Sequence, residues 1–471
     1  MPTLYFSPKD AYSVMNTLAR EVTGQSSIAV VDTSTFVSAG KSVLEAGYEN
    51  VYNALGVLIS RTIIAARPYE GKFKIIAEDN DAFDNRFRKI SFYARDNEAS
   101  GAFNTNVYTN LGAGLDDESG AGSMWDQNPA IPTERYFFSD MVWMKSHTTY
   151  WEQAKQAFTD ERSFIDFING IMIEVQNDIE TTLEAKNRMV VLDRIAGTKL
   201  LSDRGEIGSE CAVNLTKEFN AAHGTAYTSA QLMNDHTVAF LEFFLARIKN
   251  DSDMLTNRTA MFHDPMQKTI SDVPYHVLRH TPKEYQKMIY NSRFFTQINL
   301  SLAEIFNPGM LALPNGEGCQ YWQSAKSPYA IDIKPALPEG NTSSEVKIDN
   351  VIAILFDRDG LMVNNKFTGM YTSQLNPKHL YTNSFWHYKY GICNDYSENA
   401  IIYYMSDEST EYFEGDGTTV AFELEGTATS IVSVTVNGTA KTAGTDFTFA
   451  TNTVTFASAP ADDAIIQIIY K

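Results

Sequence analysis

Two aspartates that directly follow an apolar run are the residues best placed to do chemistry. Asp357 and Asp359 lie in the segment DRDG (357–360), immediately after a run that ends at Phe356. Metal-dependent phosphoesterases often keep carboxylates at the end of a buried strand, where a bound cation activates water. No histidine or third acid follows at ligand spacing, and a turn that ends the strand accounts for the same residues. We predict a turn here, with a metal-dependent hydrolase as an alternative.

The other polar groups do not meet the spacing of known sites. His276 and His280 stand four apart, but Val277 occupies the position where a zinc protease needs glutamate. An acidic run does not match the twelve-residue calcium loop, and a second acidic group lacks the histidine that di-metal carboxylate sites use. His387 lies among aromatic residues, which favours packing over a role as a base. We therefore predict no catalytic, cofactor-binding or metal-ligating residue, and no cofactor. The acids are Glu78, Asp79, Asp81 and Asp84 in the run, and Glu174, Asp178, Glu180 and Glu184 in the second group.

Composition disfavours several classes of protein. A length of 471 residues predicts about two to four domains, and 44% hydrophobic with 20% charged residues is typical of a soluble globular protein. The net charge of −20 disfavours a protein that grips nucleic acid through a basic face. No apolar run reaches the ~18–20 residues of a membrane span, and the first residues do not resemble a signal peptide. The scattered cysteines, Cys211, Cys319 and Cys393, fit neither a metal site nor a disulfide framework, so we expect synthesis in a reducing cytoplasm.

The most prominent element is a predicted helix over residues 160–197. Its apolar residues recur three or four apart, which is the period of one helix face. Asp160, or Ser163 with Asp166, can cap its start, and Gly197 can end it. At about 1.5 Å per residue it would span roughly 55 Å, more than a small domain needs to fill its own core. The apolar face consists of Phe164, Ile168, Met172, Val175, Ile179, Leu183 and Val190, and Glu184 with Arg188 is spaced for a surface ion pair.

An extended arm is predicted directly before this helix. Residues 72–76, 86–95 and 135–142 have strand character, and the last two segments flank a glycine-rich stretch, 96–130. A two-stranded hairpin of this kind is marginally stable alone in water. One interpretation is a flexible surface loop, and the other is an arm that becomes ordered on a neighbouring subunit and buries its aromatic residues there. A further helix, over 41–67, is predicted before the arm.

After the long helix, the pattern predicts an α+β body. We expect a polar connector over 200–227, a helix over 229–249, and another helix that starts at Thr281-Pro282 and runs toward Asn291. The strongest buried strand is predicted over 346–356, with further strands over 361–363 and 401–404. Helices inserted between distant strands indicate an α+β fold rather than a regular alternation of strand and helix.

The chain from residue 406 onward differs in composition from the rest. It is rich in Thr, Val, Ala and Gly, and it carries ten acids and two lysines. Asn437-Gly438 is a strong hairpin signal between two runs of strand character. We predict a small antiparallel sandwich appended to an already complete domain, with strands over 418–424, 433–436, 447–449, 453–456 and 464–470.

In this order, an N-terminal arm, a β-hairpin arm, a long helix and an α+β body resemble the major capsid proteins of tailed bacteriophages, which have the Hong Kong 97-type fold. The resemblance covers roughly residues 30 to 405. The run over 351–403 is similar to the end of the capsid proteins of small podovirus-type phages, which often carry a C-terminal immunoglobulin-like domain. The residues that carry it are 351–363 (VIAILFDRDGLMV), Asn376-Pro377, Tyr381, Phe385-Trp386-His387-Tyr388 and 398–403 (ENAIIY).

The resemblance implies a structural protein and not an enzyme. Its subunits would self-assemble as pentamers and hexamers into an icosahedral head shell that encloses double-stranded DNA without sequence-specific binding. It implies a separate scaffolding protein and a portal protein as partners, no membrane, and a location in the virion after synthesis in the host cytoplasm. The C-terminal domain would be displayed on the capsid surface. The alternative is a surface adhesin or carbohydrate-binding protein that uses the C-terminal sandwich.

The resemblance also divides the chain into five parts. They are an N-terminal arm with the first helix (1–70), an extended β-arm or E-loop (71–150), a spine helix with the peripheral domain (151–225), an axial domain whose strands return to the peripheral domain (226–406), and an immunoglobulin-like β-sandwich (407–471).

Overall fold

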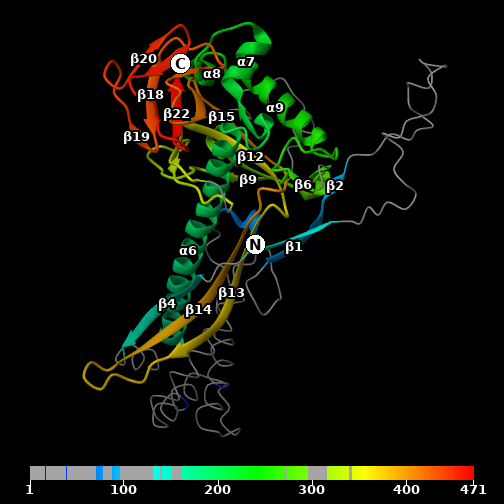
Figure 1. Cartoon of the computed structure of the whole chain (residues 1–471). Coiled ribbons are helices and arrows are strands. Elements are labelled where there is room, and N and C mark those ends of the chain that lie inside the picture. The colour runs from blue at the N-terminus through cyan, green and yellow to red at the C-terminus, as the bar shows by residue number, and fades with distance from the viewer. Residues whose placement is uncertain are drawn as a thin grey trace, which may run out of the picture. The chain divides into compact units, whose positions relative to one another are not determined.

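The computed structural model describes residues 71–77, 87–95, 131–137, 141–150, 161–270, 273–294, 316–338 and 342–471, together with Asn16 and Ala39. The described elements are helices and sheets segregated along the chain, which confirms the predicted α+β class (Figure 1). The predicted helix over 41–67, the glycine-rich stretch and the acidic run at 78–84 lie outside the described residues. The chain divides into two compact units, residues 1–86, 138–190 and 362–392 in the first, and 87–137, 191–361 and 393–471 in the second.

The predicted long helix is confirmed as α6, Glu161–Asp203, with 43 residues. At about 1.5 Å per residue it is roughly 65 Å long. Ser163 lies inside the helix, so it is not the cap, and Asp160 is outside the described residues. The prediction that Gly197 ends the helix was wrong: the helix continues to Asp203, and the turn after it is closed by Gly205, whose φ is 72°. The Glu206 amide then donates to the Leu201 carbonyl at 3.0 Å, as in a Schellman end.

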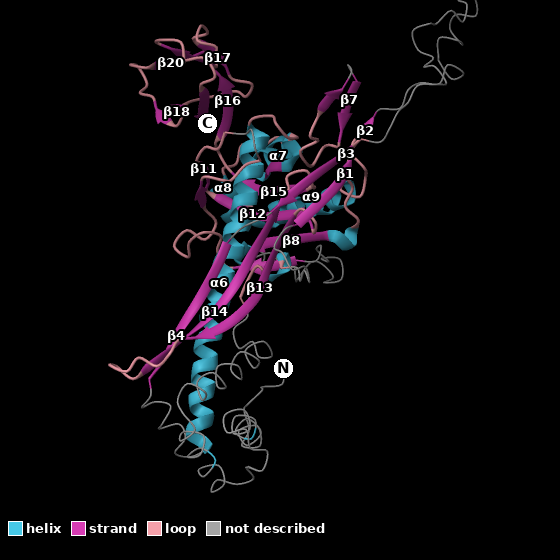
Figure 2. Cartoon of the chain, turned by 60° about the horizontal axis from the view of Figure 1, so that its bottom comes forward, coloured by secondary structure: helices cyan, strands magenta, loops and turns pink. Residues whose placement is uncertain are grey.

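The first unit pairs α6 with a three-stranded antiparallel sheet of order β13-β14-β4 (Figure 2). The strands are β4 (Met141–Tyr150), β13 (Leu361–Thr372) and β14 (Tyr381–Asn394). Trp143 stacks on Tyr388 with ring centroids 4.6 Å apart, and Lys186 of α6 lies over the Trp143 ring at 4.8 Å. The alternation of a strand places Val142 and Met144 on the opposite face, where they are exposed. His387 packs edge-on against Tyr371, as its aromatic surroundings predicted.

The predicted strand over 72–76 was wrong. The structure has a 3₁₀ helix, η1 (Lys74–Ile76), preceded by Phe73 in the left-handed region with a φ of 63°. The bend buries Phe73 and Ile76, and α6 satisfies the backbone that a strand partner would have satisfied. The Asn187 amide donates to the Phe73 carbonyl at 3.2 Å, and the Lys72 amide donates to Glu184 at 3.1 Å.

The second unit is built on a five-stranded sheet of order β5-β15-β12-β8-β9. The predicted strand over 346–356 is confirmed as two pieces, of which β12 is buried along nearly its whole length. Helices α7, α8 and α9 contribute to the hydrophobic core against this sheet, where Phe240 and Phe244 lie beside Tyr403. The bounds are β5 (Ala212–Asn214), β8 (Gln286–Asn291), β9 (Gly316–Cys319), β10 (Ile331–Ile333), β11 (Val346–Ile348), β12 (Asn350–Asp357), β15 (Ala400–Met405), α7 (Leu215–His223), α8 (Ser229–Asn234) and α9 (Thr237–Met254).

Two predictions in this unit were wrong. The connector over 200–227 contains the end of α6, a 3₁₀ helix η3 (Ser209–Cys211), β5 and α7. The helix predicted from Thr281 is a short 3₁₀ helix, η4 (Lys283–Tyr285), followed by β8. The Thr281 hydroxyl donates to Asp357 instead of capping a helix, and Met288 is buried where β8 pairs with β12. Pairing with a central strand thus overrides the local capping signal.

The predicted hairpin is confirmed as β1 (Phe87–Phe92) and β3 (Pro132–Phe137), which pair antiparallel. The predicted bounds of its second strand, 135–142, were wrong, because residues 141–142 belong to β4, which pairs with β14. The register places Lys89 opposite Arg135 on one face, and Arg88 opposite Tyr136 on the other. Beyond a break at Tyr93, β2 (Ala94–Arg95) joins a small sheet with β6 (Lys268–Ile270) and β7 (Val273–His276).

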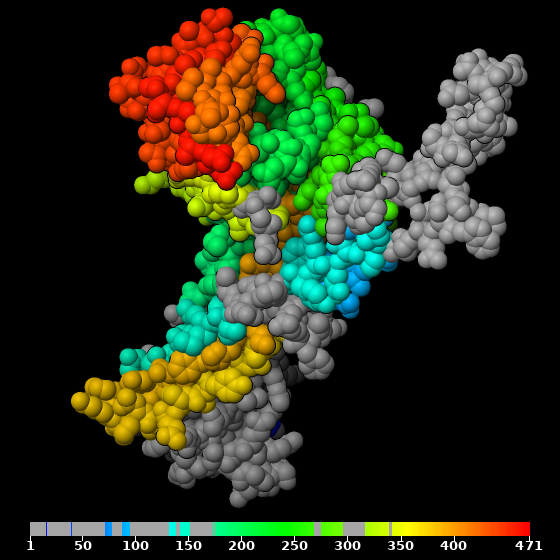
Figure 3. Space-filling model, viewed as in Figure 1, coloured from blue at the N-terminus to red at the C-terminus, as the bar shows by residue number. Residues whose placement is uncertain are grey.

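The predicted C-terminal sandwich is confirmed as two antiparallel sheets that share one hydrophobic core. Their strand orders are β16-β22-β18-β19 and β17-β21-β20. Asn437 and Gly438 both have positive φ, 51° and 76°, as expected of the turn between β18 and β19. In Figure 3 the sandwich is the rounded lobe coloured orange to red. Its strands are β16 (Ser409–Glu414), β17 (Ala421–Glu423), β18 (Ile431–Val436), β19 (Thr439–Ala440), β20 (Phe447–Ala450), β21 (Thr453–Phe456) and β22 (Ile465–Tyr470).

Candidate functional site: an ionic cluster at the base of the hairpin

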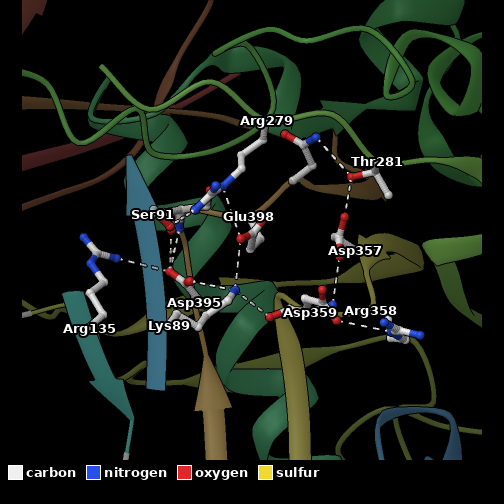
Figure 4. Close-up of polar contacts among 12 residues, drawn as sticks. Lys89, Ser91, Arg135, Arg279, Thr281, Asp357, Arg358, Asp359, Asp395 and Glu398 are labelled. Carbon is white, nitrogen blue, oxygen red and sulfur yellow. Dashed lines mark hydrogen bonds and ion pairs between the residues drawn. The ribbon is translucent and has the colours of Figure 1, made fainter. Parts of the chain in front are cut away.

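A polar site with many connected side chains lies under the hairpin of β1 and β3 in the second unit. Alternation along β1 turns Lys89 and Ser91 toward the body of the unit, and the register brings Arg135 of β3 beside Lys89. The opposing groups come from two loops that are remote in sequence, the turn after β12 and the segment between β14 and β15 (Figure 4). We call this set the ionic cluster: Lys89, Ser91, Arg135, Arg279, Asp395 and Glu398.

Lys89 is the centre of the cluster. Its ammonium group donates to the Asp359 carbonyl at 2.8 Å, to Asp395 at 2.9 Å and to Glu398 at 3.0 Å. An ammonium group has three protons, so all of its donors are used. Its side chain is 17% exposed, which makes this a largely buried cation and not a surface ion pair.

Two arginines complete the cluster. Arg135 donates to the second oxygen of Asp395 at 3.1 Å. Arg279 pairs with Glu398 at 3.1 Å and also donates to the Ser91 hydroxyl at 2.6 Å. Strand β1 is therefore held through both of its inward polar side chains.

The electrostatics keep Asp395 ionised. Burial alone would raise the pKa of its carboxyl group, but the charge of Lys89 and hydrogen bonds from Lys89 and Ser397 lower it to about 2. Burial also opposes the charge on Lys89, yet Asp395 and Glu398 outweigh it and raise the pKa of the ammonium group. Burial raises the pKa of Glu398, although Lys89 and Arg279 oppose this. Lys89 and Asp395 thus stabilise each other's charge against the cost of burial.

The aspartates singled out in the sequence form the expected turn. The Gly360 amide donates to the Asp357 carbonyl at 2.9 Å, and the Asp359 amide donates to the Asp357 carboxylate at 2.8 Å. The Asp359 carboxylate pairs with Arg358 at 3.2 Å, so it points to a cation of the chain (Figure 4). Among the described residues, no three His, Cys, Asp or Glu side chains are grouped so that they could hold a metal ion.

The remaining candidates are dispersed. His276 lies in β7 opposite Ala94, and His280 is exposed beyond the end of that strand. On α6, Asp178 pairs with Lys145, Glu180 with Lys74 and Glu184 with Arg188, so three of the four acids of the supposed di-metal group have a cation of the first unit as partner. The three cysteines are buried, and none of them forms a disulfide with another described residue.

Sequence reasoning missed the cluster and a buried histidine, His263. Lys89 and Ser91 stand on the same strand face as the buried Phe87, which is a polar signal at a position where an apolar residue is expected. The polar run over 395–399 directly precedes the buried strand β15 and carries the same signal. Their pairing was not readable, since Lys89 and Asp395 are 306 residues apart.

An α+β body with a long helix, a hairpin tied to it by ionised side chains and an appended sandwich has the element order of the predicted capsid class. The chain belongs to the family of Phi29-like phage major capsid proteins, whose family model matches residues 15–404. It is therefore a major capsid protein, a structural subunit of the head shell of a tailed phage, and its place is the virion. The family and the described elements together confirm the predicted recognition and the predicted capsid fold class.

Solved capsid structures give weak similarity over most of the chain. A chain of the Staphylococcus phage Andhra capsid is 10% identical, with a TM-score of 0.44, and covers 70% of this chain and 83% of its own. A chain from the structure of the head fibre and inner core protein of bacteriophage P68 is 12% identical, with a TM-score of 0.47, and covers 72% and 86%. A capsid chain of Helicobacter pylori bacteriophage KHP30 is 11% identical, with a TM-score of 0.36, and covers 72% and 92%.

Two further comparisons are negative. The curated proteins contain no match to the chain. Within the described part of the chain, no helix has the length and apolar content that a membrane crossing needs.

Proposed function

We propose that the protein tiles an icosahedral shell of pentamers and hexamers around double-stranded DNA. The observation that carries this proposal is the outer face of the hairpin, which leaves large apolar side chains in solvent. Ile90 is 53% exposed, Phe92 59% and Tyr136 57%. Adjacent apolar side chains at such exposure are typical of an interaction surface, and a second subunit would bury them. The net charge of −20 supports enclosure of DNA without a sequence-specific grip on it.

The five-part division of the chain belongs to the same proposal. Residues 1–70 would be the N-terminal arm and first helix, 71–150 the E-loop lying over a neighbour, 151–225 the spine helix and peripheral domain, and 226–406 the axial domain. Residues 407–471 would be an immunoglobulin-like domain displayed on the outer surface. The family model stops at residue 404, which supports treating the sandwich as an addition to the shell-forming part.

The proposed partners are a scaffolding protein during assembly and a portal protein at one vertex, with synthesis in the host cytoplasm. The first test is light scattering with negative-stain images of the full chain, alone and co-expressed with its scaffolding protein. Rings, tubes or shells with five- and six-fold units support the proposal. A monomer of about 53 kDa under both conditions contradicts it.

A matched pair of variants makes the test specific to the hairpin. Phe92→Glu places a charge on the outer face of the hairpin and should block assembly. Val432→Glu places the same charge at a 47% exposed apolar position of the sandwich and should leave assembly intact. Equal assembly of the two variants would exclude the hairpin face as a subunit contact.

The sandwich supports a second candidate function, because it lies beyond the residues that the family model matches. It would then act as an adhesin or a carbohydrate-binding module. Protease treatment of intact particles should remove an exposed sandwich and leave the shell. A glycan-binding signal that is lost with the sandwich would favour the adhesin function, and protection of the sandwich would contradict surface display.

A further inference from the structure

A chain of four buried polar side chains lies beside the ionic cluster. His263 is 1% exposed, Asn399 1%, Thr281 0% and Asp357 5%. His263 Nδ1 lies 2.9 Å from Asn399 Oδ1, Asn399 Nδ2 lies 3.1 Å from Thr281 Oγ1, and Thr281 Oγ1 lies 2.6 Å from Asp357 Oδ2. Buried groups of this kind need partners of the correct polarity, so the chain can be analysed bond by bond.

The Asp357 carboxylate determines which group donates and which accepts in each hydrogen bond of the chain. An ionised carboxylate only accepts, and it accepts here from the Thr281 hydroxyl and from the Asp359 amide. The single proton of Thr281 is thereby used, so the Thr281 oxygen must accept from the Asn399 amide nitrogen. The amide oxygen of Asn399 is then turned to His263, and His263 Nδ1 must donate to it.

The other nitrogen of the same ring faces a second acceptor. His263 Nε2 lies 2.8 Å from the Val277 carbonyl oxygen, which also only accepts. A neutral imidazole has one N–H group, whereas this arrangement needs two. The observed geometry is therefore complete only when His263 carries its second proton.

Loss of that proton reverses the donor and acceptor roles along the hydrogen-bond chain. With the remaining proton on Nε2, Nδ1 becomes an acceptor, and the Asn399 amide must turn over to donate to it. The amide oxygen then faces Thr281, and the Thr281 hydroxyl turns to donate to it instead of to Asp357. The carboxylate of Asp357 loses one of its hydrogen bonds in the process.

The consequence reaches the hairpin. Asp357 accepts from the amide of Asp359, and the carbonyl of Asp359 accepts from Lys89 at 2.8 Å (Figure 4). Asn399 directly follows Glu398, which also binds Lys89. Two members of the chain, Asp357 and Asn399, therefore adjoin the segments that hold β1.

Three charged groups act on His263. Asp264, its neighbour in sequence, favours the protonated ring, Arg279 disfavours it, and Asp357 lies at the far end of the hydrogen-bond chain. Burial lowers the pKa of His263, and the hydrogen bonds to Val277 and Asn399 oppose burial. His263 therefore takes up its second proton at a pH below the ordinary histidine pKa of about 6.5.

We propose that His263 is a proton-operated switch that sets the direction of the His263–Asn399–Thr281–Asp357 chain and thereby tightens the base of the hairpin on acidification. This inference goes beyond shell formation and does not depend on it. The switch acts within one subunit, because all of its groups lie in the second unit.

The test follows hydrogen exchange of the full chain between pH 5 and pH 8 by mass spectrometry. Exchange at the imidazole carbon of His263 reports its protonation, and amide exchange over 87–92, corrected for the intrinsic pH dependence, reports the hairpin. We expect the protection of β1 to fall about threefold to tenfold as pH rises through the His263 midpoint, the size expected of one hydrogen bond.

Two variants and a control isolate the switch. Thr281→Val should leave His263 titrating while the hairpin no longer responds, and the ionic cluster is unchanged in this variant. His263→Gln should abolish the response, whereas His280→Gln at an exposed position should not. A hairpin response that persists in Thr281→Val overturns the proposal. So does a wild-type His263 that does not titrate, a measurement that needs no variant to fold.

Discussion

The phenol of Tyr396 packs directly against the backbone of α6 at Gly197. A Cβ atom at residue 197 would lie 1.9 Å from the Tyr396 hydroxyl oxygen and 2.7 Å from the ring carbon that bears it. Tyr396 is 3% exposed, and the Arg194 guanidinium lies 4.5 Å from its ring centroid, so the ring has no free space to move into. Gly197 is thus a point of close contact inside α6, near its C-terminal end, and does not terminate the helix.

Gly197→Ala should destabilise the protein. Alanine gains about 1 kcal/mol of helix propensity over glycine, but overpacking a buried site costs about 1–3 kcal/mol, and this contact is severe. We expect a net loss of about 2 kcal/mol in the free energy of unfolding, measured by urea titration. In a Tyr396→Ala background the clash is gone, and the same substitution should become stabilising. An equal effect in both backgrounds would refute the close contact.

Lys89→Met should loosen the hairpin. It leaves Asp395 and Glu398 largely buried with fewer cations, and breaking a buried ion pair from one side costs about 3–5 kcal/mol. We expect a loss at the lower end of this range, because Arg135 and Arg279 remain. Limited proteolysis should cut the hairpin faster in this variant.

A matched control stands one residue earlier on the same strand. Arg88 pairs with Glu134 on the exposed face of the hairpin. Arg88→Met should leave both the urea midpoint and the proteolysis rate unchanged, since solvent-exposed pairs contribute little. Similar losses for the two methionine variants would show that the cluster does not anchor the hairpin.

Asp395 should account for much of the change in the free energy of unfolding between about pH 4 and pH 2. Its pKa is lowered from the ordinary Asp value to about 2, so the unfolded chain takes up this proton at a higher pH than the folded chain does. The stabilisation is fully present above about pH 4 and is lost as pH falls toward 2, a change of about 2 kcal/mol. Asp395→Asn should flatten the pH dependence of the urea midpoint in this window. An unchanged slope would exclude the assignment.

The cysteines should resist alkylation in the native protein. Cys211 and Cys393 are buried, and burial raises the pKa of each thiol to about 12, so almost no thiolate forms at pH 8. We expect mass spectrometry after iodoacetamide treatment to find neither residue modified without denaturant and both modified in urea. Rapid native labelling of Cys211 would contradict the packing of that region.

The sequence predicted best those elements whose signal lies in their own residues. Strand-forming residues and turn signals located β1 and the sandwich strands, and the three- and four-residue period located α6. Local signals failed where distant partners decide the conformation. Thr281 begins a sequence that is well formed as a helix start. Its hydroxyl instead donates to Asp357, and the next segment pairs with β12 as a strand.

The candidate site could not be predicted from the sequence for the same reason. Lys89 meets Asp395 and Glu398 across more than 300 residues, and a lysine on a strand gives no sign of which acid it will bind. His263 stands alone in the sequence, and its role depends on four groups from three other segments: Val277, Thr281, Asp357 and Asn399. The local signals were the polar residues on the inward face of β1 and the polar run over 395–399 before β15.

The first and last strands of the sandwich are neighbours, with Ser409 of β16 opposite Tyr470 of β22. The chain therefore enters and leaves the sandwich at the same end of this sheet, and Lys471 pairs with Glu408 there. A peptide fused after Lys471 would emerge beside the point where the sandwich joins the rest of the chain. One inserted between Asn437 and Gly438 would instead sit at a hairpin tip whose added atoms meet open space. A peptide that is to be exposed on this subunit should therefore be inserted in the turn between β18 and β19 and not fused after Lys471.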